Sequence, residues 1–343
     1  MKANFLIRYM LLVSILVSFV QACSGTKTEQ PPMKTVKLKV LSMPYLTFAP
    51  FFIAQEEGYF SEQGLEIEFV QFDSLSQAIP ALVQGELDVV SGHIRASIFS
   101  AITGGAPIKI VADKGFVNPA GCSDTAFLAS KSLVEDGKLD NPSQTAGRKV
   151  SVDLTNYEGY FLDQILGPAG LTIDDVTLVE DIPSATQSDA FGSGAVDVLF
   201  AAEPWLTRIQ NGGNAVMWIA PKDIIPDFEY GVIAYGPSLL TDNPEAGKRF
   251  MVAYLKGVQR YNQGKTKRNL EILAKYTELD QEILQEACWP SFRQNGNINL
   301  QSVLDFQTWA MGKGYLDKIV SGDQIWEPLF VDYANQVLDS AQP

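Results

Sequence analysis

Short apolar runs and amphipathic runs alternate along residues 36–114. The apolar runs are rich in β-branched residues, which is typical of strands, whereas the runs between them repeat hydrophobic positions with helical spacing and end at glycine. The strand-like segments are VKLKVLSM (36–43), LEIEFVQF (65–72), LDVVSG (87–92) and PIKIVADK (107–114), and the helix-like segments are 51–60, 74–86 and 94–105. Strands that alternate with helices predict an α/β fold with mainly parallel sheets covered on both faces.

The same order of elements recurs over residues 147–220, with strand-like segments at 176–182, 196–201 and 215–220. Asp88 and Asp197 lie 109 residues apart, and each follows a glycine that ends a helix-like run. This spacing is far longer than the 20–50 residues of a solenoid repeat, so we expect two copies of a whole α/β lobe. Because Asp88 recurs, we expect it to be structural, tying the end of a helix to the next strand.

From about residue 242 the pattern changes to amphipathic helices alone. Asn243, Pro244 and Glu245 predict a helix start, because Asn caps, Pro fits the first turn and a carboxylate meets the positive end of the helix dipole. The predicted helices are 244–263, 266–276, 280–288, 300–313 and 329–340. They indicate a helical cover rather than a third sheet domain.

The N-terminus has the features of an export signal. Lys2 and Arg8 precede LLVSILVSFV (11–20), an apolar stretch too short to span a bilayer, and VQAC (20–23) resembles a bacterial lipobox. We therefore predict a lipoprotein signal peptide over 1–22, a lipid on Cys23 and a polar tether over 23–35. The chain would then be lipid-anchored outside the cytoplasm, in the periplasm or on the outer face of the cytoplasmic membrane. An ordinary cleaved signal with an incidental cysteine is the alternative.

The amino-acid composition limits the classes of molecule that the chain is expected to bind. The formal net charge is −14, from 40 acidic and 26 basic residues, so the chain repels phosphate backbones and nucleic-acid binding is disfavoured. No other apolar run approaches the length of a transmembrane helix. Cys122 and Cys288 are too few for a metal site, and they are either a disulfide or two buried free thiols.

The stretch APFFIAQEEGYFSEQGLEIEFVQF (49–72) resembles a motif of the lipoproteins that bind nitrate, sulfonates, taurine and thiamine-precursor pyrimidines for ABC importers. Gly58-Tyr59-Phe60 and Gly64-Leu65 carry the motif, although DLTNYEGY (153–160) stands where many members have a Gly/Ser/Thr-rich loop. The resemblance implies the type II periplasmic-binding-protein fold, in which two α/β lobes enclose a ligand cleft. Lobe one would comprise 36–115 and 235–343 with the C-terminal helices, and lobe two 116–234.

Ligands of open parallel sheets bind at the carboxyl ends of strands, which selects four loops in this chain. These loops are MPYLTF (43–48), SGH (91–93), DLTNY (153–157) and AAEPW (201–205). Their aromatic residues offer large contact areas for a flat ligand, although each could instead pack inside its lobe. The aromatic candidates are Tyr45, Phe48, Tyr157 and Trp205, with Tyr230 as a weaker one.

Polar side chains in the same loops are candidate partners of a ligand. Asp153 and Glu203 could accept hydrogen bonds from amino or ring N–H groups, although Glu203 equally fits the start of a helix. Arg95 is the only basic side chain that the sequence places next to these loops, and it is either a ligand contact or a solvated helix residue. His93, the single histidine, has no counterpart in the second copy. The polar candidates are Ser91, His93, Asp153, Asn156 and Glu203.

The expected function is that of the solute-binding component of an ABC transporter. It would hold a small nitrogen-heterocyclic solute, such as a pyrimidine, between its lobes and deliver it to a permease and ATPase complex. An aliphatic sulfonate, taurine or a nitrate-type anion is the alternative ligand, for which helix N-termini at 49–52, 94 and 156–159 would supply donors. A ligand-sensing module without transport is the alternative role. We expect a monomer that uses no cofactor and no metal.

An enzyme is disfavoured by the motifs. A catalytic triad would need His93 beside a serine and a carboxylate, and Ser91 is only two residues away. However, the chain has no G-x-S-x-G turn for an exposed nucleophile and no H-E-x-x-H pair for a metal.

Overall fold

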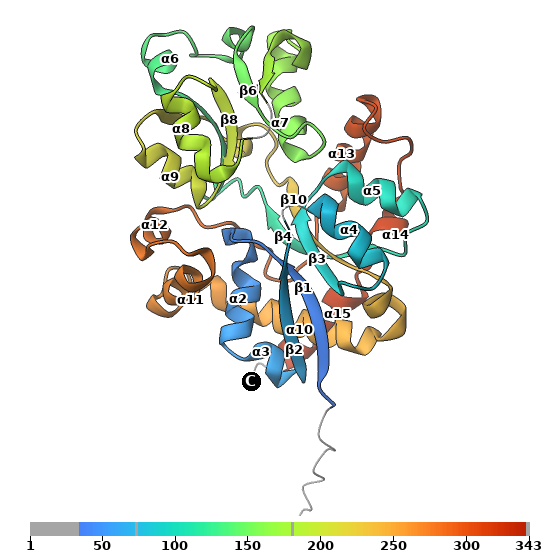
Figure 1. The fold of residues 1–343 in the computed structure, drawn as a ribbon. Helices are drawn as coiled ribbons and strands as arrows, with labels where there is room; N and C mark the ends of the chain where they lie inside the picture. The colour runs from blue at the N-terminus through green and yellow to red at the C-terminus, as the bar shows by residue number, and fades with distance from the viewer. Residues whose placement is uncertain (1–33, 73–74, 180–181, 341–343) are drawn as a thin grey trace, which may run out of the picture. The chain divides into compact units, whose positions relative to one another are not determined.

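The computed structural model describes residues 34–72, 75–179 and 182–340. The signal peptide, the lipid on Cys23 and most of the tether fall outside the described residues. The first of two five-stranded sheets has the order β2-β1-β3-β10-β4 (Figure 1). Its strands are β1 (Val36–Ser42), β2 (Leu65–Gln71), β3 (Val89–His93), β4 (Lys109–Phe116) and β10 (Glu229–Tyr235). β1 is parallel to β2 and β3, whereas β10 is antiparallel to β3 and β4.

The second sheet repeats this arrangement with the order β7-β6-β8-β5-β9. β6 is parallel to β7 and β8, and β5 is antiparallel to β8 and β9. Its strands are β5 (Thr125–Ser130), β6 (Lys149–Ser151), β7 (Thr177–Val179), β8 (Val198–Ala202) and β9 (Ala215–Ile219). The two-lobed α/β fold predicted from the sequence is therefore confirmed, with one antiparallel strand inserted into each sheet.

Two chain segments cross between the lobes, 117–124 after β4 and 220–228 before β10. They pair with each other, since the Val117 amide donates to the Phe228 carbonyl and the Asp227 amide donates to the Val117 carbonyl, both at 2.8 Å. β10 hydrogen-bonds within the first sheet. Lobe two therefore ends ahead of Glu229, several residues before the predicted boundary at 234.

Helices cover both sheets, and the longest ones follow the second crossing (Figure 1). Lobe one carries α2 (Ala49–Glu56), α3 (Tyr59–Glu62), α4 (Leu75–Val83) and α5 (Ala96–Thr103), and lobe two carries α6 (Lys131–Glu135), α7 (Tyr157–Leu166), α8 (Gln187–Gly192) and α9 (Trp205–Asn211). The C-terminal helices are α10 (Pro244–Tyr261), α11 (Lys267–Thr277), α12 (Gln281–Glu286), α13 (Leu300–Gly312), α14 (Gly322–Ile325) and α15 (Leu329–Ser340). The predicted cap is present, because the Asn243 side chain accepts from the Ala246 amide at 3.2 Å.

The C-terminal helices bind lobe one and reach lobe two. α10 packs on α2, α3 and α15, whereas α13 packs on both α5 and α7. Between α13 and α7, the Trp309 indole N–H donates a hydrogen bond to Asp163 at 3.2 Å. A disulfide joins Cys122 of the first crossing to Cys288 beyond α12, which decides between the two states that the sequence left open. Among the described residues, no helix has the length and hydrophobicity to cross a membrane.

The repeated aspartates hold the same position in the two sheets. Asp88 accepts from the Lys39 amide at 2.7 Å and its own amide donates to the Lys39 carbonyl at 2.9 Å. Asp197 does the same with Lys149, at 3.0 and 2.8 Å. Their structural role is confirmed, but the partner is the neighbouring parallel strand rather than the end of the preceding helix.

Candidate functional site

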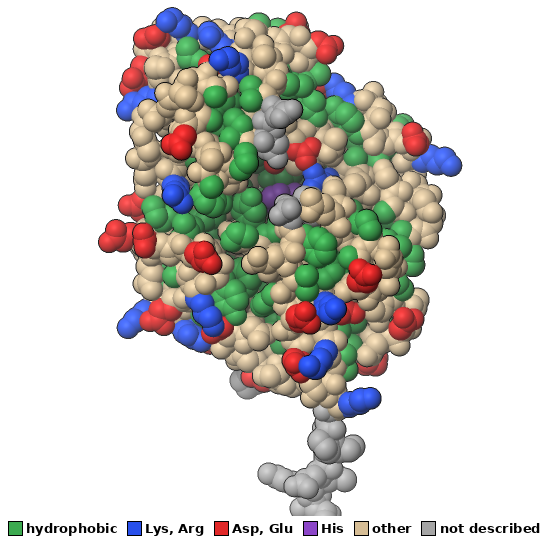
Figure 2. Space-filling view, viewed as in Figure 1, with side chains coloured by type: hydrophobic (Ala, Val, Ile, Leu, Met, Phe, Trp, Pro, Cys, Tyr) green, Lys and Arg blue, Asp and Glu red, His purple; other side chains and the backbone are tan. Residues whose placement is uncertain are grey.

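The loops selected from the sequence lie where the two lobes meet. The turn after β3 pairs with the loop before α7, because Ala96 donates to the Thr155 carbonyl at 2.9 Å and Tyr157 donates to the Ile94 carbonyl at 3.2 Å. Figure 2 shows a hollow on one face of the molecule with the histidine side chain at its floor. The structure therefore brings strand ends from both lobes to one place, as the predicted ligand cleft requires.

An ion pair spans the lobes at this junction. Arg95, at the N-terminal boundary of α5, donates from Nη2 to Oδ2 of Asp153. The other oxygen of Asp153 accepts from the amide and hydroxyl of Thr155, at 2.8 and 2.7 Å, which fixes the carboxylate. The Arg95 side chain is only 13 % exposed, so the interpretation as a solvated helix residue is wrong.

His93 lies in an aromatic cluster contributed by both lobes. Its ring packs edge-on against Tyr157 at 4.8 Å between centroids and against Tyr230 at 6.0 Å, and the two tyrosines stack at 5.7 Å. Burial, with Lys114 and Arg95 nearby, lowers the pKa of His93 to about 3. At neutral pH the imidazole is therefore uncharged and offers one hydrogen-bond donor and one acceptor.

Several polar atoms next to this cluster have no protein partner. Within the residues that the structure describes, the Ser91 hydroxyl, the Tyr157 hydroxyl and Nε of Arg95 are buried and make no hydrogen bond. Ser91 and His93 are two residues apart on β3 and so share one face of the sheet. Buried polar groups are nearly always paired in folded proteins, so these three atoms are suited to pair with a bound molecule or water.

Lys114 is a site residue that the sequence analysis missed, and Arg95 is therefore not the only basic side chain here. Lys114 is 1 % exposed; its Nζ donates to the Thr47 hydroxyl at 3.0 Å and lies 3.7 Å from the centroid of the Phe48 ring. Burial lowers the pKa of Lys114 well below its usual value. The only signal in the sequence is a lysine at the end of a strand-like run, which resembles a solvated strand end.

A buried carboxyl also adjoins the cluster. The Tyr230 hydroxyl donates to Oδ2 of Asp124 at 2.5 Å, and burial raises the pKa of Asp124 to about 7. The Tyr230 ring packs directly on Gly115 of β4. Any side chain at residue 115 would prevent this contact, because a Cβ there would lie only 2.7 Å from the Tyr230 ring, and the backbone φ of +139° also favours glycine. The weaker aromatic candidate from the sequence thus occupies a central position, and the Tyr45 hydroxyl meets Ser184 of lobe two at 3.3 Å nearby.

Three predicted site residues make hydrogen bonds or packing contacts within the protein itself. The Glu203 carboxylate accepts from the Thr207 amide and hydroxyl at 3.1 and 2.8 Å and from the Cys288 amide at 2.9 Å. Asn156 caps α7 by accepting from the Glu158 amide at 2.7 Å. Trp205 packs on a separate apolar cluster of lobe two. The ligand roles predicted for these residues stay untested, and their contacts favour the structural alternatives. No group of three or more potential metal ligands occurs in the described part of the chain.

Two α/β lobes, each with one inserted antiparallel strand and joined by paired crossings, define the type II periplasmic-binding-protein fold. The chain belongs to the NMT1/THI5-like family, whose model matches residues 46–263. It is 27 % identical to the putative binding protein BAB2_1146 of Brucella abortus over 68 % of this chain and 69 % of that protein. It is 25 % identical to the riboflavin-binding protein RibY of Chloroflexus aurantiacus over 67 % of this chain and 63 % of that protein.

Solved structures share the fold at low sequence identity. The ligand-binding component of an ABC-type import system from Staphylococcus aureus aligns with a TM-score of 0.71 and 17 % identity over 88 % of this chain and 99 % of that one. The nitrate-binding protein NrtA of Synechocystis aligns with a TM-score of 0.70 and 16 % identity over 90 % and 89 %. The desulfurization enzyme DSZB has the same fold, with a TM-score of 0.65 and 14 % identity over 88 % and 99 %. The fold therefore serves both binding and catalysis.

Proposed function

We propose that this chain is the extracytoplasmic solute-binding component of an ABC importer, which captures a small solute between its lobes and delivers it to a permease and ATPase complex. The observation that carries the proposal is the set of unpaired polar atoms of Ser91, Arg95 and Tyr157 where the two lobes meet. Family membership supports it, as does the likeness to the import-system component from Staphylococcus aureus.

The preferred ligand is a nitrogen heterocycle. The neutral His93 imidazole and the free hydroxyls of Ser91 and Tyr157 are each able to donate and to accept, which suits a ring that carries both carbonyl and N–H groups. The aromatic side chains around them offer apolar surface to such a ring. The relative RibY, by its name, binds riboflavin, which is a flat nitrogen heterocycle.

One observation favours an anion as the second candidate. Lys114 is buried beside Phe48 and Thr47. Among the described residues, Nζ of Lys114 donates a hydrogen bond to Thr47 alone. A sulfonate or nitrate oxygen would satisfy the remaining N–H groups and favour the charged amine. A neighbour with this fold, the alkanesulfonate-binding protein SsuA of Xanthomonas axonopodis, was solved with MOPS bound.

Ligand capture would act through closure of the lobes. The Arg95–Asp153 and Tyr45–Ser184 contacts form between lobes, so a ligand that adds further contacts across the junction favours the closed form. The crossings 117–124 and 220–228 would absorb the rotation, since they are the two chain segments that link the sheets.

We also propose that the chain is a monomer held at the membrane by a lipid on Cys23. The Cys122–Cys288 disulfide supports an oxidising compartment outside the cytoplasm. Replacing Cys23 by alanine should move the protein from the membrane fraction to the soluble fraction. A membrane fraction that keeps the Cys23→Ala variant would remove the anchor from the proposal.

A thermal-shift screen tests the ligand class. Pyrimidines, flavins, sulfonates, nitrate and amines are compared at equal concentration, and a ligand at about 100 times its Kd should stabilise the folded state by about 2.7 kcal/mol. We expect heterocycles to stabilise the protein and Ser91→Ala to reduce the shift. Ser132→Ala is the matched control, because Ser132 is exposed on lobe two. Stabilisation by sulfonates or nitrate alone selects the anion, and no stabilisation by any class contradicts the proposed function.

A further inference from the structure

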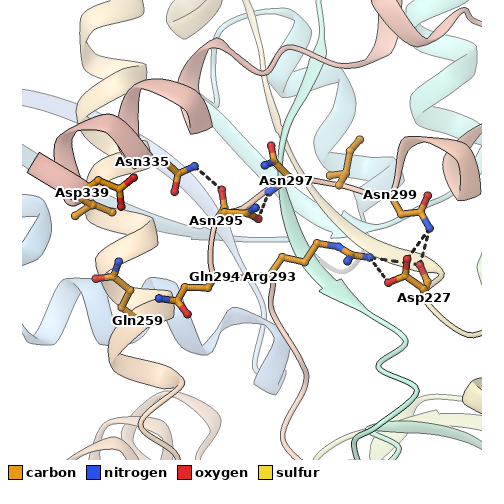
Figure 3. A pocket seen from close by; sticks show the side chains of 11 residues that line it. Asp227, Gln259, Arg293, Gln294, Asn295, Asn297, Asn299, Asn335 and Asp339 are labelled. Atoms are coloured by element: carbon orange, nitrogen blue, oxygen red, sulfur yellow. Dashed lines mark hydrogen bonds and ion pairs between the residues drawn. The ribbon is translucent and has the colours of Figure 1, made fainter.

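A second cavity, of about 850 Å³, lies among the C-terminal helices and beside the second crossing (Figure 3). α10 contributes Gln259 to its wall, α15 contributes Asn335, and the loop between α12 and α13 contributes Gln294 and Asn297. Ligand pockets are usually lined by apolar and aromatic side chains with few polar groups. This wall is instead dominated by side-chain amides, so it suits a ligand whose own surface is polar.

The amides divide into fixed and free groups. Nδ2 of Asn335 donates to the Asn295 carbonyl at 2.9 Å and to the Val331 carbonyl at 2.8 Å, which holds this side chain in place. The side-chain amides of Gln259, Gln294 and Asn297 form no hydrogen bond with any described part of the chain, although all three line the cavity. Each free amide offers two donor hydrogens and an acceptor oxygen.

The charges at the cavity argue against an anionic ligand. Nη2 of Arg293 pairs with Asp227 at 2.8 Å and its Nε lies 3.4 Å from Glu229, so the guanidinium already has carboxylate partners. Asp339 adds an exposed carboxylate to the opposite side of the lining. Ile298, which is half-buried, and Leu338, which is buried, add apolar atoms to the lining. A neutral molecule with hydroxyl groups and C–H faces matches this combination.

We propose that this cavity is a second ligand site, for a neutral, hydroxyl-rich molecule of disaccharide size. A hydroxyl both donates and accepts, as an amide does, so the three free amides, which come from α10 and from the loop between α12 and α13, are able to pair with successive hydroxyls of one ligand. The cavity volume falls within the range of about 300–1,000 Å³ that holds drug-sized ligands. The site belongs to the C-terminal helices and shares no residue with the His93 cluster between the lobes.

Trehalose and sucrose are the probes, and side-chain amide signals in ¹H–¹⁵N NMR spectra are the readout. Melting temperatures are unsuitable, because sugars stabilise most proteins by exclusion from their surfaces. The NH₂ signals of Gln259, Gln294 and Asn297 should shift together and saturate. Gln294→Ala and Asn297→Ala should each weaken binding about fivefold, the value of one neutral hydrogen bond. Gln301→Ala is the control, since its amide bonds Asp305 on α13 at 2.9 Å and does not line the cavity.

Three outcomes would overturn the inference. The first is the absence of any shift at ~20 mM of either sugar, a concentration that would reveal even millimolar affinity. The second is a shift that His93→Gln abolishes and the amide variants leave intact, because the sugar would then occupy the junction between the lobes. The third is binding of inorganic phosphate at these amides in preference to both sugars, which would contradict the neutral class. Failure here leaves the proposed solute capture between the lobes unaffected, because the thermal-shift screen tests that independently.

Discussion

Replacing Tyr157 by phenylalanine should make the ligand-free protein more stable and the proposed site weaker. Tyr157 is 0 % exposed, its hydroxyl has no partner among the described residues, and its ring packs against His93, Phe161, Phe200 and Tyr230. Phenylalanine keeps all of these ring contacts and removes only the oxygen. Opposite signs for stability and binding separate a site residue from a purely structural one.

The magnitude follows from the burial of the hydroxyl. An unpaired buried donor costs about 1–3 kcal/mol, so Tyr157→Phe should raise the free energy of unfolding by about 1 kcal/mol or more. In a chain of this size that corresponds to a rise in Tm of roughly 2 °C. A ligand that bonds this hydroxyl would lose about 0.5–1.5 kcal/mol, or roughly 2–12-fold in Kd. Urea unfolding and isothermal titration with a ligand from the screen measure the two effects.

Tyr333→Phe is the matched control. Tyr333 is half-buried on α15, makes no hydrogen bond to the described chain, and packs against the core cluster of lobe one that contains Phe250 and Phe330. Its replacement should change stability by less than about 0.5 kcal/mol and leave binding intact. A Tyr157→Phe protein less stable than the wild type by about 1 kcal/mol would refute the reasoning, because the hydroxyl would then be paired in solution.

Three further predictions concern the disulfide and the buried titratable groups. The Cys122–Cys288 bond spans 166 residues, so loop entropy predicts that its loss lowers the unfolding free energy by up to about 5 kcal/mol; urea midpoints with and without dithiothreitol test this, and a Cys122→Ser/Cys288→Ser variant should not respond. Because the pKa of Asp124 is raised to about 7, its carboxyl releases a proton on unfolding, and its contribution to stability should decrease as the pH rises from about 4 to 7; the unfolding free energy of the wild type relative to Asp124→Asn should therefore fall over that rise, and a constant difference would contradict it. Because the pKa of His93 is lowered to about 3, its contribution to stability should decrease as the pH drops from about 6.5, which offsets the Asp124 effect in the wild type; the unfolding free energy of the wild type relative to His93→Gln should therefore fall as the pH drops in the same series.

The sequence predicted most elements because their signals are local. The five predicted C-terminal helices are present within three residues of the predicted ends, while the short α14 was not predicted, and the Asn243 cap explains why α10 starts where it was predicted. The repeat of lobes followed from spacing alone. β5 and β10 were not predicted. Both are buried and lack the alternation of polar and apolar positions that identifies a half-exposed strand, and neither belongs to the strand–helix alternation that identified the equally buried β3 and β8.

Lys114 shows why the site was harder to predict than the fold. A lysine at the end of PIKIVADK (107–114) normally reaches solvent, and nothing local indicates that it is buried beside Phe48. That contact joins β4 to the segment after β1, which only the tertiary fold brings together. Glu203 illustrates the converse, because it follows a strand end that the sequence selected, while its carboxylate accepts hydrogen bonds from Thr207 and Cys288 of the protein itself.

Comparing equivalent positions of the two lobes distinguishes residues that maintain the fold from candidate ligand-binding residues. Positions that match between the lobes, such as Asp88 and Asp197, make the same backbone contacts in both sheets. A shift of 109 residues places Ser91 and His93 opposite Phe200 and Ala202, so the polar positions of β3 correspond to apolar ones in β8. Two lobes of equal architecture therefore present unequal strand ends to each other. Lobe one supplies most of the free hydrogen-bonding groups, and lobe two supplies Tyr157 of the aromatic cluster and the carboxylate that Arg95 binds. Under the function proposed above, a ligand would therefore bond mainly to lobe one, and the Tyr157 hydroxyl would add a contact from lobe two that favours the closed form.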